Sequence, residues 1–526
     1  MMRSPYADEV IPDVSVFDFL FADLSEDDAG RVALIDGVSG GETTFGELRA
    51  RIEAFAGALA ARGIGPGDVV ALHSPNVPAF VIAFHGILRS GATATTVNAL
   101  YTTAEVARQL EDSGATMLVT VGPLLPQSGP AAEEAGIPAD RVIVLDGADG
   151  HPSLAELLAE RAAAPSVRID PATHVAVMPY SSGTTGFPKG VRLSHRNLVA
   201  NVVQCTPVLD VESDDVVLAV LPFFHIYGMT VLLDLALSRR ARLVTMPRFD
   251  LAEFLRIIQD HRCTYLFIAP PIAVALAKHP LVEEYDLSSA RALLSGAAPL
   301  DEKLAGAVAE RLGVRVRQGY GMSELSPVSH VIPPERDDLS LGGIGVPIAN
   351  VECRLVDLET GEDIDTPSEG ESRPGELAVR GPNVMLGYLG HDDDTARTID
   401  AEGFLHTGDV AVVLADGSFR IVDRVKELIK YHGYQVAPAE LEAVLLAHPS
   451  IADAAVIGVP DADGQEIPKA FVVRAAGHDD LDEAAVMAHV AGLVAPHKKV
   501  RAVEFIEVVP KSTSGKILRK DLRAAQ

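Results

Sequence analysis

The stretch THVAVMPYSSGTTGFPKG, residues 173–190, joins an apolar run to a loop of unusual composition. The run THVAVMPY predicts a buried strand, and the ten residues after it hold three glycines, four hydroxyl side chains, Pro188 and Lys189. Glycine lets backbone N–H groups converge on an anion without obstruction by a Cβ atom, and serine or threonine adds donors. The loop is therefore suited to polyphosphate, although taken alone such a loop is more often a plain surface connection.

The loop does not have the spacing of a Walker P-loop. That motif needs Gly-Lys and then Ser or Thr after four intervening residues. Here Gly183 is followed by Pro188 and Lys189 at the corresponding places, and then by Gly190. A phosphate-binding role must therefore be supported by other segments of the chain.

Length and charge limit the classes of protein that this chain can represent. With 526 residues it is too long for one core, so we expect several domains. Its net charge of -29 argues against nucleic acid or an anionic membrane as partner, because such binding depends on clustered Lys and Arg. Only residues 496–520 reverse this trend, and they form a basic patch.

Targeting signals and cysteine spacing give further expectations. No apolar run approaches the ~18 residues of a membrane span. The chain reaches Asp8 and Glu9 before any apolar segment, and its last residues carry no peroxisomal signal, so we expect a cytoplasmic protein. Cys205, Cys263 and Cys353 form no C-x-x-C pair and indicate neither a disulfide framework nor a zinc site. We expect three inert core thiols.

Strand-like and helix-like segments alternate along most of the first 340 residues. A capping box of Thr44 and Glu47 opens an amphipathic helix that stops at Gly63. Strand-like segments separated by helix-like segments follow at 68–74, 92–98 and 116–121 and, after the loop, at 241–247, 264–270 and 291–296. This βαβ order predicts parallel sheets. We therefore expect an α/β fold whose large N-terminal domain holds two α/β layers.

The pattern changes in the last third of the chain. Short strands with turn signals predict a small β subdomain at about 341–421, where Asp416-Gly417 is expected to be a two-residue hairpin turn. Beyond Arg424, two helix-like and several strand-like segments predict a compact α+β domain. We therefore predict two domains, an N-terminal domain of residues 1–424 and a C-terminal domain of residues 425–526.

Four further stretches also place polar or glycine residues within apolar surroundings. They are LPFFHIYG (221–228), QGYGMSE (318–324), GFLHTGD (403–409) and PKSTSGK (510–516). In this order and spacing they closely resemble the motifs of adenylate-forming enzymes, which include acyl-CoA synthetases, adenylation domains and firefly luciferase. SSGTTGFPKG, GELAVRG (375–381) and PFFHIYGM look most like 4-coumarate:CoA ligases, including bacterial cinnamate-activating members. The resemblance covers nearly the whole chain.

The resemblance implies that this chain binds ATP, Mg²⁺ and CoA. The ATP- and AMP-binding residues that it implies are Ser181, Ser182, Gly183, Thr184, Thr185, Lys189, Gly296, Ala297, Ala298, Gln318, Gly319, Tyr320, Gly321, Met322, Ser323, Asp409, Arg424 and Lys516. Among these, the small residues and Tyr320 would line an adenine slot, and Asp409 would accept the ribose hydroxyls with help from Arg424. Glu324 would hold the Mg²⁺ ion, because a carboxylate is a hard oxygen ligand.

The resemblance also implies which residues act on the acid and on CoA. The catalytic residues would be Lys516, Lys430, His225 and Gln435. Lys516 would bridge the carboxylate and the α-phosphate during adenylation. Rotation of a mobile C-terminal domain about Lys426 would then exchange Lys516 for the face that carries Lys430 and Gln435. The CoA-binding residues would be Arg248, His432 and Gly433.

The acyl pocket implied by the resemblance is apolar and narrow enough for a planar ring. Its residues would be His225, Tyr227, Met229, Gly296, Gly319, Pro327 and Val328. Val231 stands where plant hydroxycinnamate ligases commonly have a serine, which shifts the expected preference toward unsubstituted cinnamate. Tyr227 could still meet a 4-hydroxyl group.

The expected activity is that of an acid–thiol ligase. ATP would convert a cinnamate- or 4-coumarate-type acid to acyl-AMP with release of pyrophosphate, and the acyl group would pass to the thiol of CoA. Alternatives are another aryl or a medium-chain acyl-CoA ligase, or the loading of a separate carrier protein. An inactive nucleotide-binding regulator would be expected to lack one of the polar residues Lys189, Glu324, Asp409 and Lys516, yet all four are present. The sequence indicates no oligomeric state.

Overall fold

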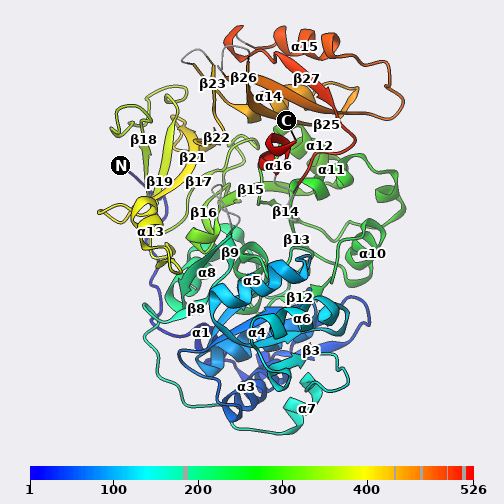
Figure 1. The fold of residues 1–526 in the computed structure, drawn as a ribbon, viewed down its shortest axis with the longest axis vertical. Coiled ribbons are helices and arrows are strands. Elements are labelled where there is room, and N and C mark those ends of the chain that lie inside the picture. Colours follow the sequence, from blue (N-terminus) through cyan, green and yellow to red (C-terminus); the bar gives the residue numbers. More distant parts are fainter. Residues whose placement is uncertain (182–187, 432–433, 462–465, 495, 512–516, 526) are drawn as a thin grey trace.

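The computed structural model describes residues 1–181, 188–431, 434–461, 466–494, 496–511 and 517–525, and only the backbone of residues 430, 434 and 435. Two large mixed sheets, a smaller antiparallel sheet and a C-terminal α+β unit build the chain (Figure 1). The α/β fold expected from the βαβ order is confirmed. Among the helices that the structure describes, none is long and apolar enough to cross a membrane.

The first sheet is parallel at its centre and antiparallel at the edge that carries the loop 181–190. Its order is β20-β10-β8-β5-β4-β6-β7, with β9 paired to β10. Strands β8 to β7 run parallel, whereas β10 is antiparallel to β8 and β20. Its strands are β4 (Val69–His73), β5 (Thr93–Thr96), β6 (Ala115–Thr120), β7 (Val142–Val144), β8 (Val175–Val177), β9 (Tyr180–Ser181), β10 (Lys189–Ser194) and β20 (Gly387–Tyr388).

The first helix associated with this sheet begins and ends as its sequence predicts. Helix α3 begins after Thr44, whose side chain accepts from the backbone of Glu47 while the Glu47 carboxylate accepts from the Thr44 N–H. The predicted capping box is therefore confirmed, and Gly63 follows the helix at φ +78°. The helices are α3 (Phe45–Ala61), α4 (Pro78–Ser90), α5 (Thr103–Ser113), α6 (Leu125–Glu134) and α8 (His195–Leu209).

The second sheet has the order β17-β16-β15-β14-β13-β11-β12-β2-β3 and a parallel centre from β15 to β2. Its strands are β2 (Val32–Asp36), β3 (Glu42–Thr44), β11 (Val216–Ala219), β12 (Arg242–Thr245), β13 (Tyr265–Ile268), β14 (Ala292–Ser295), β15 (Arg315–Gly321), β16 (Val328–Val331) and β17 (Val346–Pro347). Its helices include α10 (Leu251–His261), α11 (Pro270–Lys278) and α12 (Glu302–Leu312). The N-terminal hairpin β2–β3 thus completes a sheet built mainly from residues more than 170 positions later.

The third sheet is antiparallel, and one turn in it differs from the prediction. Its strands, in spatial order, are β1 (Met2–Arg3), β18 (Glu352–Val356), β19 (Gly375–Arg380), β21 (Leu405–Val413) and β22 (Phe419–Arg424). The Leu414 N–H donates to the Ser418 carbonyl, so the loop inside this pair consists of three residues, 415–417. The two-residue turn at Asp416-Gly417 was wrong, because Gly417, at φ +82°, ends a three-residue loop.

In its described residues the C-terminal unit contains two small sheets, three α-helices and one 3₁₀ helix, and Figure 1 shows it at one end of the long axis. Its elements are β23 (Ile429–Tyr431), β24 (Tyr434–Val436), α14 (Pro438–Leu446), β25 (Ile451–Pro460), β26 (Glu466–Arg474), α15 (Glu483–Ala491), β27 (Ala502–Phe505) and α16 (Arg519–Ala524). It has its own apolar core, which includes Val436, Leu441, Val456 and Val486.

The three cysteines lie outside the C-terminal unit. All three are free and buried, and burial raises the pKa of each thiol, as expected of inert core residues.

Candidate active site

Lys189 lies near the end of the predicted phosphate loop, residues 181–190, and is the first residue of strand β10. Its ammonium group pairs with the carboxylate of Asp394 on α13 (Asp392–Thr398). The Lys189 Nζ atom also lies 5.4 Å from the centroid of the Tyr388 ring. Ser181 belongs to β9, while Ser182, Gly183, Thr184 and Thr185 lie outside the described residues. The sequence therefore identified Lys189 but not the partner that the fold supplies.

Glu324 lies next to this group and is held by Tyr388. It sits in the short 3₁₀ helix η5 (Ser323–Leu325) and is only 6% exposed. The Tyr388 hydroxyl donates to Glu324 Oε1 over 2.9 Å, and burial together with this carboxylate raises the Tyr388 pKa. The phenol therefore remains a donor, and the second carboxylate oxygen can coordinate a cation. The described residues contain no cluster of three metal-ligating side chains, so Mg²⁺ held here would take most of its ligands from phosphate and water.

Asp409 lies at the centre of a second polar group. Strands β21 and β22 pair Asp409 with Arg424, and Arg424 Nε lies 3.2 Å from Asp409 Oδ1. The Tyr320 hydroxyl donates to Asp409 Oδ2 over 2.6 Å, and burial raises the Tyr320 pKa well above its usual value. A carboxylate has about four acceptor positions, so two remain for ribose hydroxyls. The structure thus brings together three residues that the motif resemblance places around the nucleotide.

The small residues expected around adenine differ in how strongly the fold requires them. A Cβ atom at Gly296 would lie 2.8 Å from the Tyr227 ring, and one at Gly321 would lie 2.1 Å from the Pro327 carbonyl oxygen. At Gly319 the nearest atom would be 3.6 Å away, an ordinary contact. Next to Gly296, Ala297 has φ +70°, a backbone region that favours glycine, and its side chain is exposed.

Gln318 acts within the protein rather than at a surface of the slot. Its side chain is 4% exposed, accepts from the Leu300 N–H over 2.8 Å and donates to the Leu300 and Leu341 carbonyls. These bonds fix the segment that follows Gly296, Ala297 and Ala298. The Gln318 side chain thus supports the slot from behind, and a contact between Gln318 and the nucleotide stays a prediction.

An apolar cavity lies beside the Tyr320–Asp409 group. It encloses about 450 Å³ of space outside atoms, part of it open to solvent. The residues expected for the acyl pocket that line it are His225, Tyr227, Gly296, Gly319, Pro327 and Val328. The lining also includes residues expected around the nucleotide, namely Ala297, Tyr320, Gly321 and Met322, and four that the motifs did not indicate, namely Leu209, Ile226, Leu294 and Val331.

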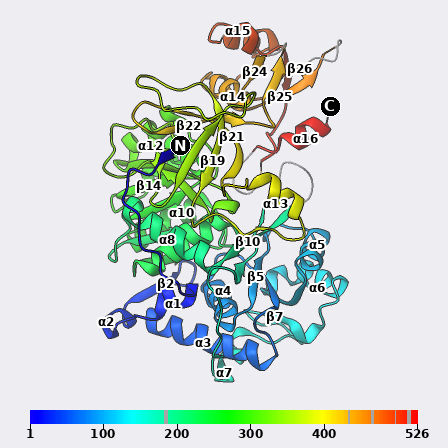
Figure 2. The ribbon, with the colours of Figure 1, turned by 90° about the vertical axis from the view of Figure 1, so that its left-hand side faces the viewer.

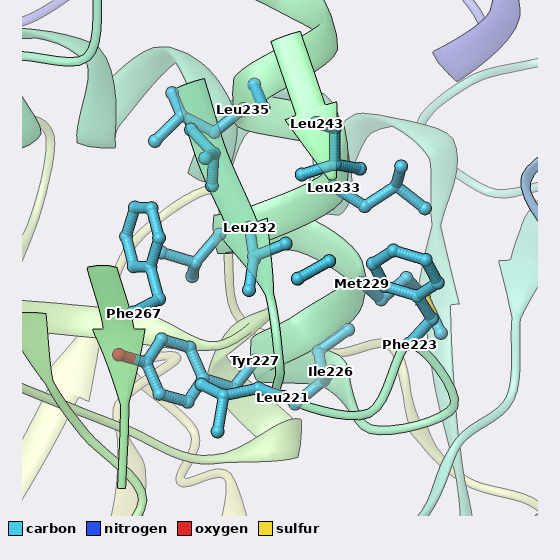
Figure 3. Close-up of a cluster of buried hydrophobic side chains, with 14 of the residues drawn as sticks. Leu221, Phe223, Ile226, Tyr227, Met229, Leu232, Leu233, Leu235, Leu243 and Phe267 are labelled. Atoms are coloured by element: carbon cyan, nitrogen blue, oxygen red, sulfur yellow. The ribbon is translucent and has the colours of Figure 1, made fainter. Parts of the chain in front are cut away.

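Two residues discussed for the acyl pocket lie elsewhere. Met229 is fully buried and lies beside Phe223 in the hydrophobic cluster of Figure 3 rather than on the cavity lining. Val231 is 1% exposed and is also absent from the lining of this cavity. Both belong to the π-helix η3 (Tyr227–Asp234), in which only the first residue reaches the cavity. The sequence did not predict this helix, which turns the later side chains into the core.

Tyr227 closes the cavity against β14. Its ring meets Phe267 edge to face, with centroids 6.5 Å apart (Figure 3). The ring also packs against Gly296. Its hydroxyl donates to the Leu294 carbonyl over 3.3 Å, and burial raises its pKa well above the usual value. The Tyr227 proton is therefore already used within the protein, whereas the hydroxyl oxygen can still accept.

His225 lies in the turn immediately before η3. Its Nδ1 atom accepts from the Tyr227 N–H over 3.3 Å, so the neutral ring carries its proton on Nε2. Burial lowers the His225 pKa to about 4, which keeps the ring neutral at pH 7. His225 can therefore donate one hydrogen bond from Nε2 without adding charge to the cavity.

The residues expected to act in the second half-reaction are only partly described. Strands β23 and β24 pair residue 430 with residue 435 in register, but the side chains of Lys430 and Gln435 lie outside the description. His432, Gly433 and Lys516 lie outside it entirely. Arg248 is exposed just beyond β12.

Lys426, the expected hinge, is exposed in a turn between the large domain and the C-terminal unit. Around it, Val425 donates to the Gly408 carbonyl, and the N–H groups of Glu427 and Leu428 donate to the Arg424 carbonyl. The neighbouring Glu427 carboxylate pairs with Arg523, and the role of Lys426 as a hinge stays a prediction.

An ionic group that the motifs did not indicate anchors the end of the chain. Both Glu442 carboxylate oxygens lie 2.7 Å from Arg519 Nη2, and Glu442 Oε1 also accepts from the Val456 N–H. Nearby, Asp423 accepts from the Ala439 N–H over 2.9 Å. Burial raises the pKa of both acids. The one sequence signal for this group was Glu442, which lies between Leu441 and Ala443 in the apolar segment AELEAVLL.

Comparison with known proteins agrees with this architecture. The family model "AMP-binding enzyme" matches residues 21–389, and the model "AMP-binding enzyme C-terminal domain" matches residues 440–516. The rice protein 4-coumarate--CoA ligase 5 is 41% identical over 535 residues, with 100% of this chain and 97% of the relative covered. The potato protein 4-coumarate--CoA ligase 2 is 42% identical over the same length, with 100% and 96% covered.

Solved structures share this fold over nearly the whole length of the chain. ATP-bound MatB from Rhodopseudomonas palustris superposes with a TM-score of 0.88 at 30% identity, covering 98% of this chain and 99% of that chain. The anthranilate CoA ligase AuaEII in complex with anthranoyl-AMP superposes with a TM-score of 0.87 at 27% identity, covering 98% and 97%. The family models and the full-length relatives together show that this chain belongs to the AMP-binding enzyme family.

Proposed function

We propose that this chain is an acid–thiol ligase that converts a cinnamate- or 4-coumarate-type acid to its CoA thioester. In the first step the acid's carboxylate attacks the α-phosphorus of ATP, which yields acyl-AMP and pyrophosphate. In the second step the CoA thiol attacks the acyl carbon, which yields the thioester and AMP. The observation that carries the proposal is the apolar cavity that shares Tyr320 with the Asp409–Arg424 group.

The polar groups would position the nucleotide. Asp409 would accept the ribose hydroxyls, while Arg424 and Tyr320 hold its carboxylate in place. Lys189 would bind phosphate oxygens, and Glu324 would hold Mg²⁺, which neutralises phosphate charge as pyrophosphate leaves. Lys516 would bridge the two reacting groups, and rotation at Lys426 would bring Lys430 and Gln435 to the site for the second step.

The cavity favours an aromatic acid with few polar substituents. Leu209, Ile226, Leu294, Val328 and Val331 provide an apolar wall, and the Tyr227 hydroxyl already donates to Leu294. At the wall formed by Tyr227 and Leu294, a ring hydroxyl would lose its water and gain at most the Tyr227 oxygen as an acceptor, which makes its burial there unfavourable. We therefore infer that cinnamate is preferred over 4-coumarate.

A pyrophosphate-release assay tests this proposal directly. Cinnamate, 4-coumarate, benzoate and medium-chain fatty acids are compared with ATP and Mg²⁺, with and without CoA, and the thioester is identified by mass spectrometry. We expect the highest kcat/KM with cinnamate and a thioester only when CoA is present. A preference for fatty acids would overturn the aryl pocket, and acyl transfer to a carrier protein in place of CoA would overturn the second step.

A further inference from the structure

The ammonium group of Lys189 is already neutralised by a carboxylate from another part of the chain. Lys189 and Asp394 are 205 positions apart, and their side chains are 18% and 23% exposed, so the ion pair is partly shielded from water. Figure 2 shows α13 beside the region of β10. An ATP phosphate that binds Lys189 must therefore compete with Asp394 for the same ammonium group.

Asp394 has a second partner that is able to retain it. Its Oδ2 atom faces Lys189, whereas Oδ1 pairs with Arg397 one turn later on α13. His391 Nδ1 lies 3.7 Å from Oδ2. The pairs with Lys189 and Arg397 hold the Asp394 pKa below its usual range, so the carboxylate is charged at pH 7. If Lys189 leaves, Asp394 keeps a cationic neighbour on its own helix.

We propose that Asp394 is an exchangeable counterion that sets the affinity for ATP: it neutralises Lys189 in the free enzyme and is retained by Arg397 when phosphate takes Lys189. This inference rests on the proposed function, since it takes Lys189 as a ligand of the ATP phosphates. The exchange replaces one ion pair by another, so neither Lys189 nor Asp394 is left as an unpaired charge in a partly buried place. Asp394 is thus a positioning residue and does not touch the reacting atoms.

The proposal makes opposite predictions for two neighbouring residues. Asp394→Asn removes the competitor, so the Kd of α,β-methylene-ATP with Mg²⁺ should fall by about three- to fivefold, the range of a partly exposed ion pair. Arg397→Gln removes the alternative partner and leaves Asp394 to Lys189, so the same Kd should rise by about two- to threefold. Simple loss of structure would weaken binding in both variants.

A double variant and a charge-matched control complete the design. Arg397 acts only through Asp394, so Asp394→Asn/Arg397→Gln should bind the analogue as Asp394→Asn does. Asp393→Asn removes the same charge from an exposed position on the same helix, so it should change the Kd by less than about twofold.

Calorimetric titration of the full chain, without acid or CoA, measures all these constants. Unchanged or weaker binding in Asp394→Asn, or equal tightening in Asp393→Asn, would overturn the counterion exchange while leaving the proposed function intact. If the unmodified protein does not bind the analogue, both the proposed function and this inference fail.

Discussion

Tyr227 and Tyr320 both line the cavity, yet the regions around them are held by different means. Tyr227 is fixed by shape, because its ring packs against Gly296 at a distance that leaves no room for a Cβ atom. Tyr320 is fixed by charge and hydrogen bonding, because its hydroxyl donates to Asp409, which also pairs with Arg424. The apolar region should therefore respond to changes of volume and the polar region to changes of charge.

Lys516, which we expect to begin the chemistry, lies outside the described residues. Lys516→Ala should slow adenylation, raising its activation free energy by about 3 to 4 kcal/mol. The reason is that the variant lacks the cation expected to bridge the carboxylate and the α-phosphate. Thioester formation from supplied acyl-AMP should be retained. The two half-reactions are measured separately, by pyrophosphate release and by CoA consumption.

Lys430→Ala is the matched variant for this prediction. It also removes one positive charge, but from the face of the C-terminal domain that we expect to meet the site in the second step. It should slow mainly the CoA step. Equal losses in both half-reactions for either variant would contradict the exchange of lysines.

A change of volume tests the apolar region. Gly296→Ala should weaken binding of the acid by about 1 to 3 kcal/mol, seen as a higher KM. The reason is that the new methyl group displaces the Tyr227 ring and overpacks the cavity wall. The affinity for the ATP analogue should change much less. Gly306→Ala on α12 is the control, because its Cβ atom would meet nothing within 4 Å and Gly306 is not part of the cavity lining. If both alanines raise KM equally, the close packing at Gly296 does not define the cavity.

A change of hydrogen bonding tests the polar region. Tyr320→Phe keeps the ring that lines the cavity but leaves Asp409 Oδ2 without its phenol donor. We expect ATP binding to weaken by about 0.5 to 1.5 kcal/mol, the usual contribution of one hydrogen bond, which appears as a higher KM for ATP. The KM for the acid should change little. A larger effect on the acid than on ATP would mean that the two regions are not separable.

The sequence predicted the two regions unequally, for a physical reason. Polar residues such as Asp409 and Glu324 stand out because they lie within apolar surroundings, and the capping box at Thr44 is local, so both could be recognised. The pairing of Lys189 with Asp394 joins segments 205 positions apart and leaves no local pattern.

The apolar wall was harder to assign. Met229 and Tyr227 look equivalent in the sequence, and only the geometry of η3 sends one to the core and the other to the cavity. The three-residue loop before Ser418 likewise depends on strand register, which composition does not fix.

Two histidines extend the comparison to pH. Burial lowers the His225 pKa to about 4, whereas the carboxylate of Glu376 raises the pKa of His406, whose Nδ1 lies 3.0 Å from it. Unfolded histidine titrates near pH 6.5, so His225 costs stability as pH falls below that value, by about 1 kcal/mol at pH 5.5. His406 instead contributes stability that is fully present at low pH and is lost as pH rises through its folded pKa.

The His225→Gln and His406→Gln variants should therefore show opposite pH dependence. His225→Gln should destabilise less at pH 5.5 than at pH 8.5, because the variant escapes the cost of keeping a buried imidazole neutral in acid. His406→Gln should destabilise more at pH 5.5, where the bond to Glu376 is charge-assisted. Urea unfolding at the two pH values measures both differences. The same direction of change in the two variants would show that charge, rather than burial, governs the histidine at the cavity.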